Sequence, residues 1–311
     1  MTTAPGLLLA LLAVPAQARA PEPAAAESLH VVATGSGPAV LLIPGLFGSA
    51  YGFRVLGPLL NAAGYRVIIV EPLGVGWSAR PAGADYSLTS QADRFAAVLD
   101  TFRIAPVLVV AHSLGSAIAF RLAVRRPELV RGIVSLEGGP TEEAVTPSFR
   151  RAMRLAPLIK LFGGGMVRGK VKGMLKESSG DPSWVTEDVL HGYTDGATKS
   201  LGAALHAYQA MGRAREPEPL APRLREIRCP VRLVVGGAPH DGGADSAEVV
   251  LLQRSLVSFA VDSVSGAGHY IHEEQPGAVL EVVRRMEAAI VREEREGVLP
   301  PGECDAHRPH S

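Results

Sequence analysis

The sequence predicts an α/β fold, in which a mostly parallel, doubly wound sheet is covered by helices and carries an inserted helical cap. Short apolar runs rich in Val, Ile and Leu alternate with helical patterns along most of the 311 residues. Most of these runs end in a loop that contains glycine. The alternation stops between Pro140 and Pro230, where only helical patterns occur, and then resumes. One core domain with a helical insertion accounts for all three observations.

Seven apolar runs are expected to form the strands of the core. They are residues 29–33, 39–43, 65–70, the run that begins at 107, 130–136, 231–235 and 258–264. Helical patterns are expected over residues 53–64, 88–103, 117–123 and 275–296. In the second of these, residues 92, 95, 96, 99 and 102 are apolar and share one face, which is typical of a helix packed on a sheet. In such a fold, ligands bind at the carboxyl ends of the strands.

The chain divides into further segments outside this core. Residues 6–14 are apolar and small-x-small triplets follow, which predicts a secretory signal peptide over residues 1–20 and an exported protein, periplasmic or secreted. Without such processing the protein would be cytoplasmic. Residues 21–28 are expected to be a linker, 29–140 and 230–296 the core, 141–229 the cap, and 297–311 a flexible tail.

Composition excludes one class of partner. Lys+Arg and Asp+Glu number 31 each, so the formal net charge is zero, and hydrophobic residues make up 47 %. Because nucleic-acid-binding domains usually carry a basic excess, we expect no nucleic-acid partner. Basic residues do gather between Arg150 and Lys176 in the cap. They could contact a membrane, but a solvated helix face is the simpler interpretation.

The stretch from Val107 to Ser116 carries the strongest chemical signal. An apolar strand pattern breaks at Ala111-His-Ser-Leu-Gly115 and becomes a helical pattern. A serine on a tight strand-to-helix turn, with small residues two positions away on either side, is typical of a nucleophile elbow. Bulk at Ala111 or Gly115 would collide with the adjoining elements. The turn would raise the Ser113 hydroxyl above the sheet and point the Leu114 N–H at a developing oxyanion.

Four segments, taken together, resemble the α/β-hydrolase superfamily. They are Pro44-Gly-Leu-Phe-Gly-Ser49, Glu71-Pro-Leu-Gly-Val-Gly-Trp-Ser78, Ala111-His-Ser-Leu-Gly115 and Gly266-Ala-Gly-His-Tyr-Ile-His-Glu-Glu-Gln-Pro276. Each follows an expected strand, and the resemblance extends from about residue 29 to 296. Two segments depart from the family pattern, since Pro44 stands where His is usual and Glu71 where Asp is usual.

The resemblance implies roles for three further groups. His269 would be the general base that takes the proton of Ser113, with His272 as a weaker rival. The N–H of Leu46 would join that of Leu114 in the oxyanion hole. The triad acid is open between two residues: Asp241 lies 28 residues before His269, as is usual in the family, but its loop is longer than usual. Glu137, which lies 24 residues after Ser113, fits the placement seen in other members, and we prefer it.

The resemblance also implies a reaction class. A serine nucleophile forms an acyl ester, so hydrolysis of a carboxylic ester is expected, as in carboxylesterases and lipases. Epoxide hydrolases and haloalkane dehalogenases instead use an aspartate at that position. Alternatives with the same triad are an acyltransferase and a cofactor-free perhydrolase, and a third is a non-catalytic ligand-binding protein. The expected partner is a small-molecule ester or acyl substrate, with no metal and no organic cofactor; the oligomeric state is left open.

Overall fold

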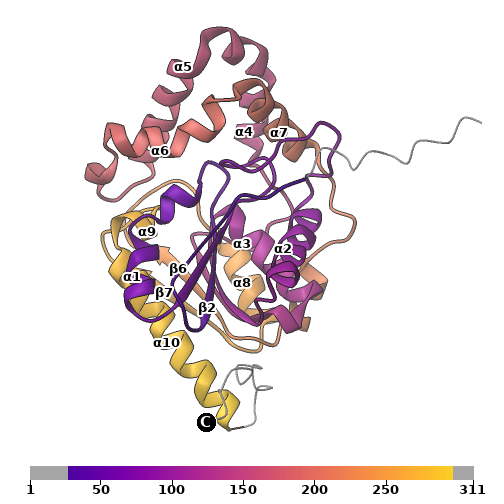
Figure 1. The fold of residues 1–311 in the computed structure, drawn as a ribbon, viewed down its shortest axis with the longest axis vertical. Helices are drawn as coiled ribbons and strands as arrows, with labels where there is room; N and C mark the ends of the chain where they lie inside the picture. Colours follow the sequence, from indigo (N-terminus) through magenta and orange to yellow (C-terminus); the bar gives the residue numbers. More distant parts are fainter. Residues whose placement is uncertain (1–26, 297–311) are drawn as a thin grey trace, which may run out of the picture.

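A computed structural model describes residues 27–296, without the side chains at positions 147, 148, 152, 155, 157–162 and 164. Its centre is a seven-stranded sheet in the order β1-β3-β2-β4-β5-β6-β7 (Figure 1). The strands are β1 (Val31–Thr34), β2 (Ala39–Ile43), β3 (Arg66–Val70), β4 (Val107–His112), β5 (Val130–Leu136), β6 (Val231–Gly236) and β7 (Phe259–Val264). Strand β1 pairs antiparallel with β3, and all other pairs are parallel. The α/β prediction with a mostly parallel sheet is confirmed; the expected signal peptide and tail lie outside the described residues.

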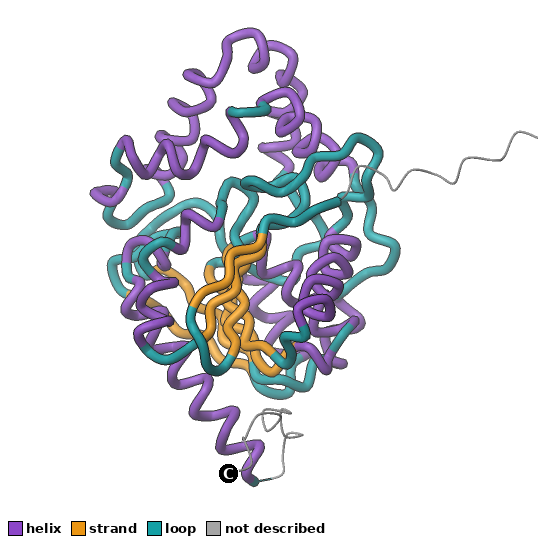
Figure 2. The backbone as a smooth tube through the Cα atoms, viewed as in Figure 1, coloured by secondary structure: helices purple, strands orange, loops and turns teal. Residues whose placement is uncertain are grey.

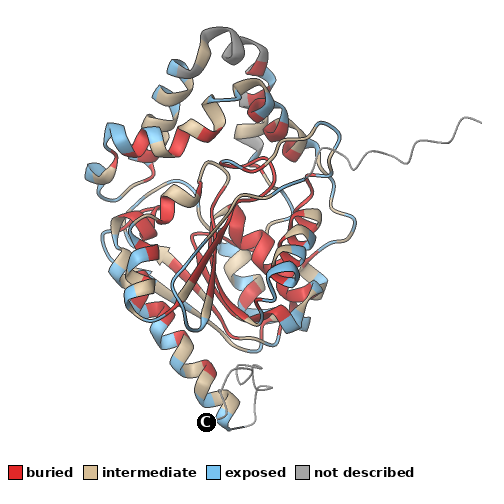
Figure 3. Ribbon diagram, in the orientation of Figure 1, coloured by how far each residue is buried: buried red, intermediate tan, exposed pale blue. Residues whose placement is uncertain are grey.

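Helices cover both faces of the sheet. Helices α1 (Leu56–Ala62) and α10 (Pro276–Arg295) pack on one face, and α2 (Leu88–Phe102), α3 (Leu114–Arg125) and α8 (Ser246–Ser255) on the other (Figures 1 and 3). Successive residues of a strand point to opposite faces, so alternate residues of each central strand enter different cores. In β2, for example, Leu41 packs with α2 and α3, whereas Leu42 packs with α1 and α10. This two-sided burial explains why the strands are continuously apolar.

The cap consists of the helices between β5 and β6: α4 (Pro147–Ala152), α5 (Ala156–Glu177), α6 (Glu187–Thr198) and α7 (Leu201–Arg213). It lies beyond one end of the sheet (Figures 1 and 2). Helix α7 packs on the loop after β3 through a cluster that includes Leu73 and Met211. Helices α5 and α6 pack around Tyr270, in the loop after β7, through Leu175 and Tyr193. The cap therefore covers the carboxyl ends of the strands, where the sequence places the candidate site.

The remaining elements are short. They are the 3-10 helices Ala50–Phe53, Pro127–Leu129, Met153–Leu155, Pro182–Trp184 and Ala221–Glu226, and helix α9 (Ile271–Glu274). Predicted boundaries differ from the observed ones by up to three residues, most clearly in two helices. The helix expected from residue 53 begins at Leu56, because Ser49 instead caps a separate 3-10 turn. Helix α3 begins at Leu114, three residues earlier than expected, directly after Ser113. The helical backbone of α5 is interrupted at Gly163, whose φ is 76°.

Several basic residues of the cap are engaged in ion pairs. Arg150 contacts Glu143 at 2.8 Å, Arg168 contacts Asp195 at 2.8 Å, and Lys172 contacts Glu187. These pairs engage three of the eight basic residues between Arg150 and Lys176. Among the described residues, no helix is both long and apolar enough to cross a bilayer.

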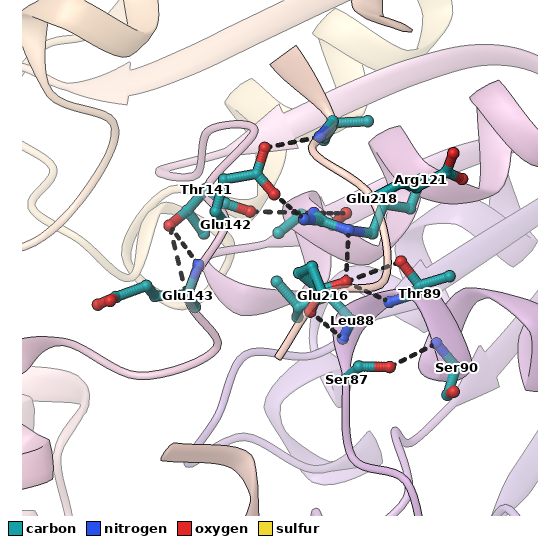
Figure 4. A network of polar contacts seen from close by, with 12 residues as sticks. Ser87, Leu88, Thr89, Ser90, Arg121, Thr141, Glu142, Glu143, Glu216 and Glu218 are labelled. Carbon is teal, nitrogen blue, oxygen red and sulfur yellow. Dashed lines mark hydrogen bonds and ion pairs between the residues drawn. The ribbon is translucent and has the colours of Figure 1, made fainter. Parts of the chain in front are cut away.

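The two connections between core and cap meet at one buried arginine, Arg121 of α3, whose side chain is 3 % exposed (Figure 4). Its guanidinium bonds Glu142 at 2.6 Å, where the chain leaves the core, and Glu216 at 3.2 Å, where it returns. Glu216 also accepts the N–H groups of Leu88 and Thr89, at 2.7 and 3.0 Å, in the first turn of α2. A negative charge at a helix N-terminus is stabilising. Arg121 and Glu216 thus fix the base of the cap to two core helices.

Replacing Arg121 with Met is expected to destabilise the protein by about 3 kcal/mol, because a mostly buried Glu216 carboxylate would lose its counter-charge. The value lies at the low end for a buried pair, since the side chain of Glu142 is 40 % exposed and can be hydrated. Urea unfolding followed by circular dichroism measures the change. The matched control is Arg125→Met, four residues along α3, whose exposed pair with Asp93 contributes about 1 kcal/mol or less. Equal losses for both variants would contradict the assigned role of Arg121.

Candidate active site

Ser113 occupies the turn between β4 and α3. Its φ and ψ are 52° and −118°, a backbone conformation that residues other than glycine rarely adopt. Such backbone strain costs about 1–3 kcal/mol and persists where the surroundings fix it. Here the Ser113 N–H donates to the Leu136 carbonyl at 2.9 Å, and the Ser113 carbonyl accepts from the Ser116 N–H at 2.9 Å. The strained turn predicted for a nucleophile elbow is present.

Two glycines allow neighbouring loops to approach this turn. A Cβ on Gly115 would lie 2.5 Å from the Ile43 carbonyl oxygen, so the predicted collision with bulk at this position is confirmed. A Cβ on Gly45 would lie 3.2 Å from that of Ser113. The loop after β2, which contains Leu46, therefore runs beside the serine. Leu114 is the first residue of α3, where backbone N–H groups have no partner within the helix.

Glu71 holds this loop in place. Its buried carboxylate accepts the Ala50 N–H at 2.7 Å and also accepts the Trp77 N–H. One carboxylate thus joins the loop after β2 to the loop after β3. The Asp-to-Glu departure noted in the sequence changes the length of the side chain but leaves it a buried loop anchor.

The loop after β7 carries His269 and is fixed by contacts on several sides. The His269 N–H donates to the Ser178 carbonyl of the cap at 2.7 Å, and the His269 carbonyl lies 3.0 Å from Nε2 of His112. The imidazole rings of His112 and His269 are 4.7 Å apart between centroids. Because His112 directly precedes Ser113, this contact places the loop of the candidate base beside the elbow.

Glu274 secures the same loop to the cap. One carboxylate oxygen accepts the Gly268 N–H at 3.0 Å. The other accepts the N–H groups of Gly180 and Asp181, each at 2.8 Å. The segment that carries His269 and the cap segment from residue 178 to 181 are therefore built as one unit.

Burial disfavours the charged form of three histidines in this region. Desolvation lowers the pKa of His269 and that of His112 well below 6.5, with neighbouring histidines adding to the effect. Burial also lowers the pKa of His272 to about 3. The ring of His272 packs between Phe53 and His112, which indicates a core position for this rival base.

Glu137 follows β5 and is 3 % exposed. One carboxylate oxygen accepts the Gly236 N–H. The other, Oε2, lies 4.0 Å from Nδ1 of His269 and 3.1 Å from Nε2 of His240. Desolvation raises the pKa of Glu137, against the lowering effect of the Gly236 and His240 contacts. At 4.0 Å, His269 and Glu137 face each other without a hydrogen bond.

Asp241, the alternative acid, is placed differently. It is exposed, and no hydrogen bond or ion pair joins its side chain to any residue that the structure describes. The following Gly242 and Gly243 have positive φ and lie over the site. A Cβ on Gly242 would be 3.0 Å from Nδ1 of His269, and one on Gly243 would be 2.0 Å from Oε2 of Glu137. The structure thus brings Glu137, and not Asp241, to His269.

Sequence reasoning did not identify His240, His112 or Glu274 as part of this site. His240 could have been noticed, because it follows β6 at the edge where the other candidates gather. The roles of His112 and Glu274 depend on contacts with backbone groups far away in the sequence, for which the sequence carries no local signal. The three residues extend the site beyond the predicted set.

The fold and this site define a class of protein. Residues 38–158 match the family model described as the alpha/beta hydrolase fold. The sheet order, the elbow and the inserted cap agree with that match, and the chain has the α/β-hydrolase fold.

Known relatives extend the comparison over most of the chain. The 2-(acetamidomethylene)succinate hydrolase of Mesorhizobium japonicum is 26 % identical over 263 residues, which cover 82 % of this chain and 90 % of the relative. A thermophilic esterase from Thermogutta terrifontis superimposes with a TM-score of 0.68 at 18 % identity, over 84 % of this chain and 93 % of the other. The meta-cleavage product hydrolase of Pseudomonas fluorescens IP01 gives 0.69 at 19 % identity, over 84 % and 94 %. These two structures share the fold.

Proposed function

We propose that the protein is a serine hydrolase that cleaves a carboxylic ester through an acyl-enzyme on Ser113. The observation that carries this proposal is the strained elbow, which holds Ser113 beside the loop of His269. Burial lowers the pKa of His269 and so favours its neutral form. Nε2 of His269 would take the Ser113 proton during attack and return it to the leaving alcohol. In the second step, His269 would take a proton from a water molecule that attacks the acyl-enzyme. The acid would then be released and the proton returned to Ser113.

Two backbone N–H groups would stabilise the tetrahedral intermediate. The N–H of Leu114 starts α3, so the helix dipole adds to its effect on a developing negative charge. The N–H of Leu46 lies in the loop that Gly45 brings against Ser113. Since both donors belong to the main chain, the unusual Pro44 changes the shape of the loop and leaves the donors intact.

Glu137 would serve as the triad acid. Its Oε2 faces Nδ1 of His269, and a movement of about 1 Å would convert the 4.0 Å separation into a hydrogen bond. Such contacts commonly tighten when substrate binds. The carboxylate would then hold the tautomer with the proton on Nδ1 and stabilise the imidazolium that forms.

The surroundings of Leu46 favour an apolar substrate. Phe47, the next residue, packs edge-on against Phe149 and Tyr208 of the cap, with ring centroids 5.0 and 5.7 Å apart. An alkyl or aryl group near the oxyanion position would meet these rings. We therefore infer an ester with an apolar acyl or aryl part, bound between the core and the cap.

A direct test combines an active-site probe with an ester series. The purified, folded protein is expected to react with a fluorophosphonate once per chain, with the adduct on the peptide that contains Ser113. It is also expected to hydrolyse p-nitrophenyl esters, with kcat/KM rising from acetate to a longer chain. Heat-denatured protein is the control for non-specific labelling. A folded sample that neither labels nor hydrolyses any ester of the series would refute the proposal.

A further inference from the structure

Three potential metal-ligand atoms converge behind the candidate base. They are Oε2 of Glu137, Nε2 of His240 and Nδ1 of His269, and all lie within 4.8 Å of one another. The carboxylate oxygen is 3.1 Å from the His240 nitrogen and 4.0 Å from the His269 nitrogen. Ligand atoms at about 2.1 Å from one tetrahedral ion lie about 3.4 Å apart, so small side-chain movements would complete the geometry.

The hydrogen bonds of His240 determine which of its nitrogens can bind a metal. Its Nδ1 lies 2.8 Å from the Ala238 carbonyl oxygen, which can only accept, so Nδ1 carries a proton. In the neutral ring, Nε2 then has a lone pair, and that lone pair faces the Glu137 carboxylate. Two acceptors facing each other at 3.1 Å repel unless a proton or a metal ion lies between them. The Ala238 carbonyl thus orients the His240 ring, in the way that a backbone carbonyl commonly orients a metal-bound histidine through its other nitrogen.

The second imidazole is also available. Nδ1 of His269 is buried and has no hydrogen-bond partner among the described residues. An unpaired buried nitrogen is costly. It points into the same space, since it is the atom of His269 that lies closest to Glu137 in the ion-pair contact. The donor set is therefore one carboxylate and two imidazoles, a combination that suits zinc and similar divalent ions once the ion has displaced any proton shared between His240 and Glu137.

We propose that Glu137, His240 and His269 form a binding site for a divalent transition-metal ion of the zinc type, and that the bound ion switches the hydrolase off. The inhibition rests on the proposed function, whereas the binding does not. Nδ1 of His269 can bind the ion only after its proton has moved to Nε2 or left to solvent. A ring with the metal on Nδ1 and the proton on Nε2 cannot accept the proton of Ser113. The ion also occupies the Glu137 oxygen that the triad requires.

Equilibrium binding of Zn²⁺ tests the site without any assay of activity. The full chain is titrated against a fluorescent zinc indicator, and the wild type is compared with His240→Gln. We expect the variant to bind Zn²⁺ at least about tenfold more weakly, the effect typical of disturbing a metal site. His240→Cys supplies a thiolate in place of the imidazole and should retain tight binding. His191→Gln is the matched control, since His191 is exposed and pairs with Asp195 at 3.6 Å on the cap surface.

The outcomes separate the metal site from the hydrolase. Tight binding in the wild type and in His191→Gln, with loss in His240→Gln, supports the site; equal affinity in all variants overturns it. If His240→Gln does not fold, the wild type is titrated with Co²⁺ instead. A four- or five-coordinate Co²⁺ site with nitrogen ligands absorbs visible light. If this absorption does not appear, the proposal is overturned. Ester hydrolysis that persists with saturating Zn²⁺ refutes the inhibition. Zinc binding without any esterase activity refutes the proposed function alone.

Discussion

Replacing Ser113 with Ala is expected to lower kcat for ester hydrolysis by a factor on the order of 10⁴ to 10⁶. Without the hydroxyl no acyl-enzyme can form, and only substrate binding and the oxyanion hole would contribute to the remaining rate. The fold should be unharmed, because the turn is held by hydrogen bonds between the backbone of Ser113 and the backbones of Leu136 and Ser116, which do not involve the hydroxyl. Relief of the unusual φ is not expected, since alanine has the same backbone preferences as serine.

Steady-state kinetics on a p-nitrophenyl ester, together with fluorophosphonate labelling, measure this loss. Ser116→Ala is the matched control. Ser116 is the third residue of α3 and is fully buried, and its hydroxyl donates to the Ala111 carbonyl at 3.1 Å. Its removal should cost about 1 kcal/mol of stability and leave turnover near the wild-type value. Ser113→Ala activity within tenfold of wild type would exclude the serine as nucleophile.

The second large effect concerns the acid. Glu137→Gln is expected to lower kcat by a factor of about 10⁴, the effect of the isosteric change of the carboxylate in a well-studied serine-protease triad. Asp241→Asn should change kcat by no more than about twofold, because exposed side chains without partners contribute little. The two variants differ in burial and position but remove the same charge, so each is a control for the other.

Kinetics with saturating substrate distinguish the two acids, and circular dichroism confirms that both variants fold. The opposite pattern, in which Asp241→Asn loses activity and Glu137→Gln retains it, would assign the role to Asp241. That result would require the loop after β6 to move, since the Asp241 side chain is exposed in this structure.

Much of the fold could be predicted because its signals are local. Continuous apolar runs identified the buried strands, and the loss of alternation after Pro140 identified the cap. The elbow could also be predicted, because the small residues around Ser113 lie in one short segment and indicate that neighbouring backbone comes close to the turn. The antiparallel pairing of β1 could not be predicted in this way, because it depends on the partner strand β3 and not on the residues of β1 themselves.

The acid could not be assigned from sequence for a physical reason. Glu137 and Asp241 both follow strands at the same edge, and spacing along the chain does not reveal which side chain turns inward. That choice depends on the nine-residue loop after β6, where Gly242 and Gly243 fit against Glu137 and His269 while Asp241 faces solvent. His240 was missed because its orientation is set by a single carbonyl, that of Ala238.

The carboxylate of Glu274 has a consequence for exchanging caps between relatives. It binds the core at Gly268 and the cap at Gly180 and Asp181, while Ser178 accepts the N–H of His269 itself. Residues 178–181 therefore belong functionally to the core, although they lie within the insertion. A chimaera that replaces helices α4 to α7 should keep this tetrapeptide from the host. Such an exchange is expected to leave the geometry of the loop that carries His269 undisturbed.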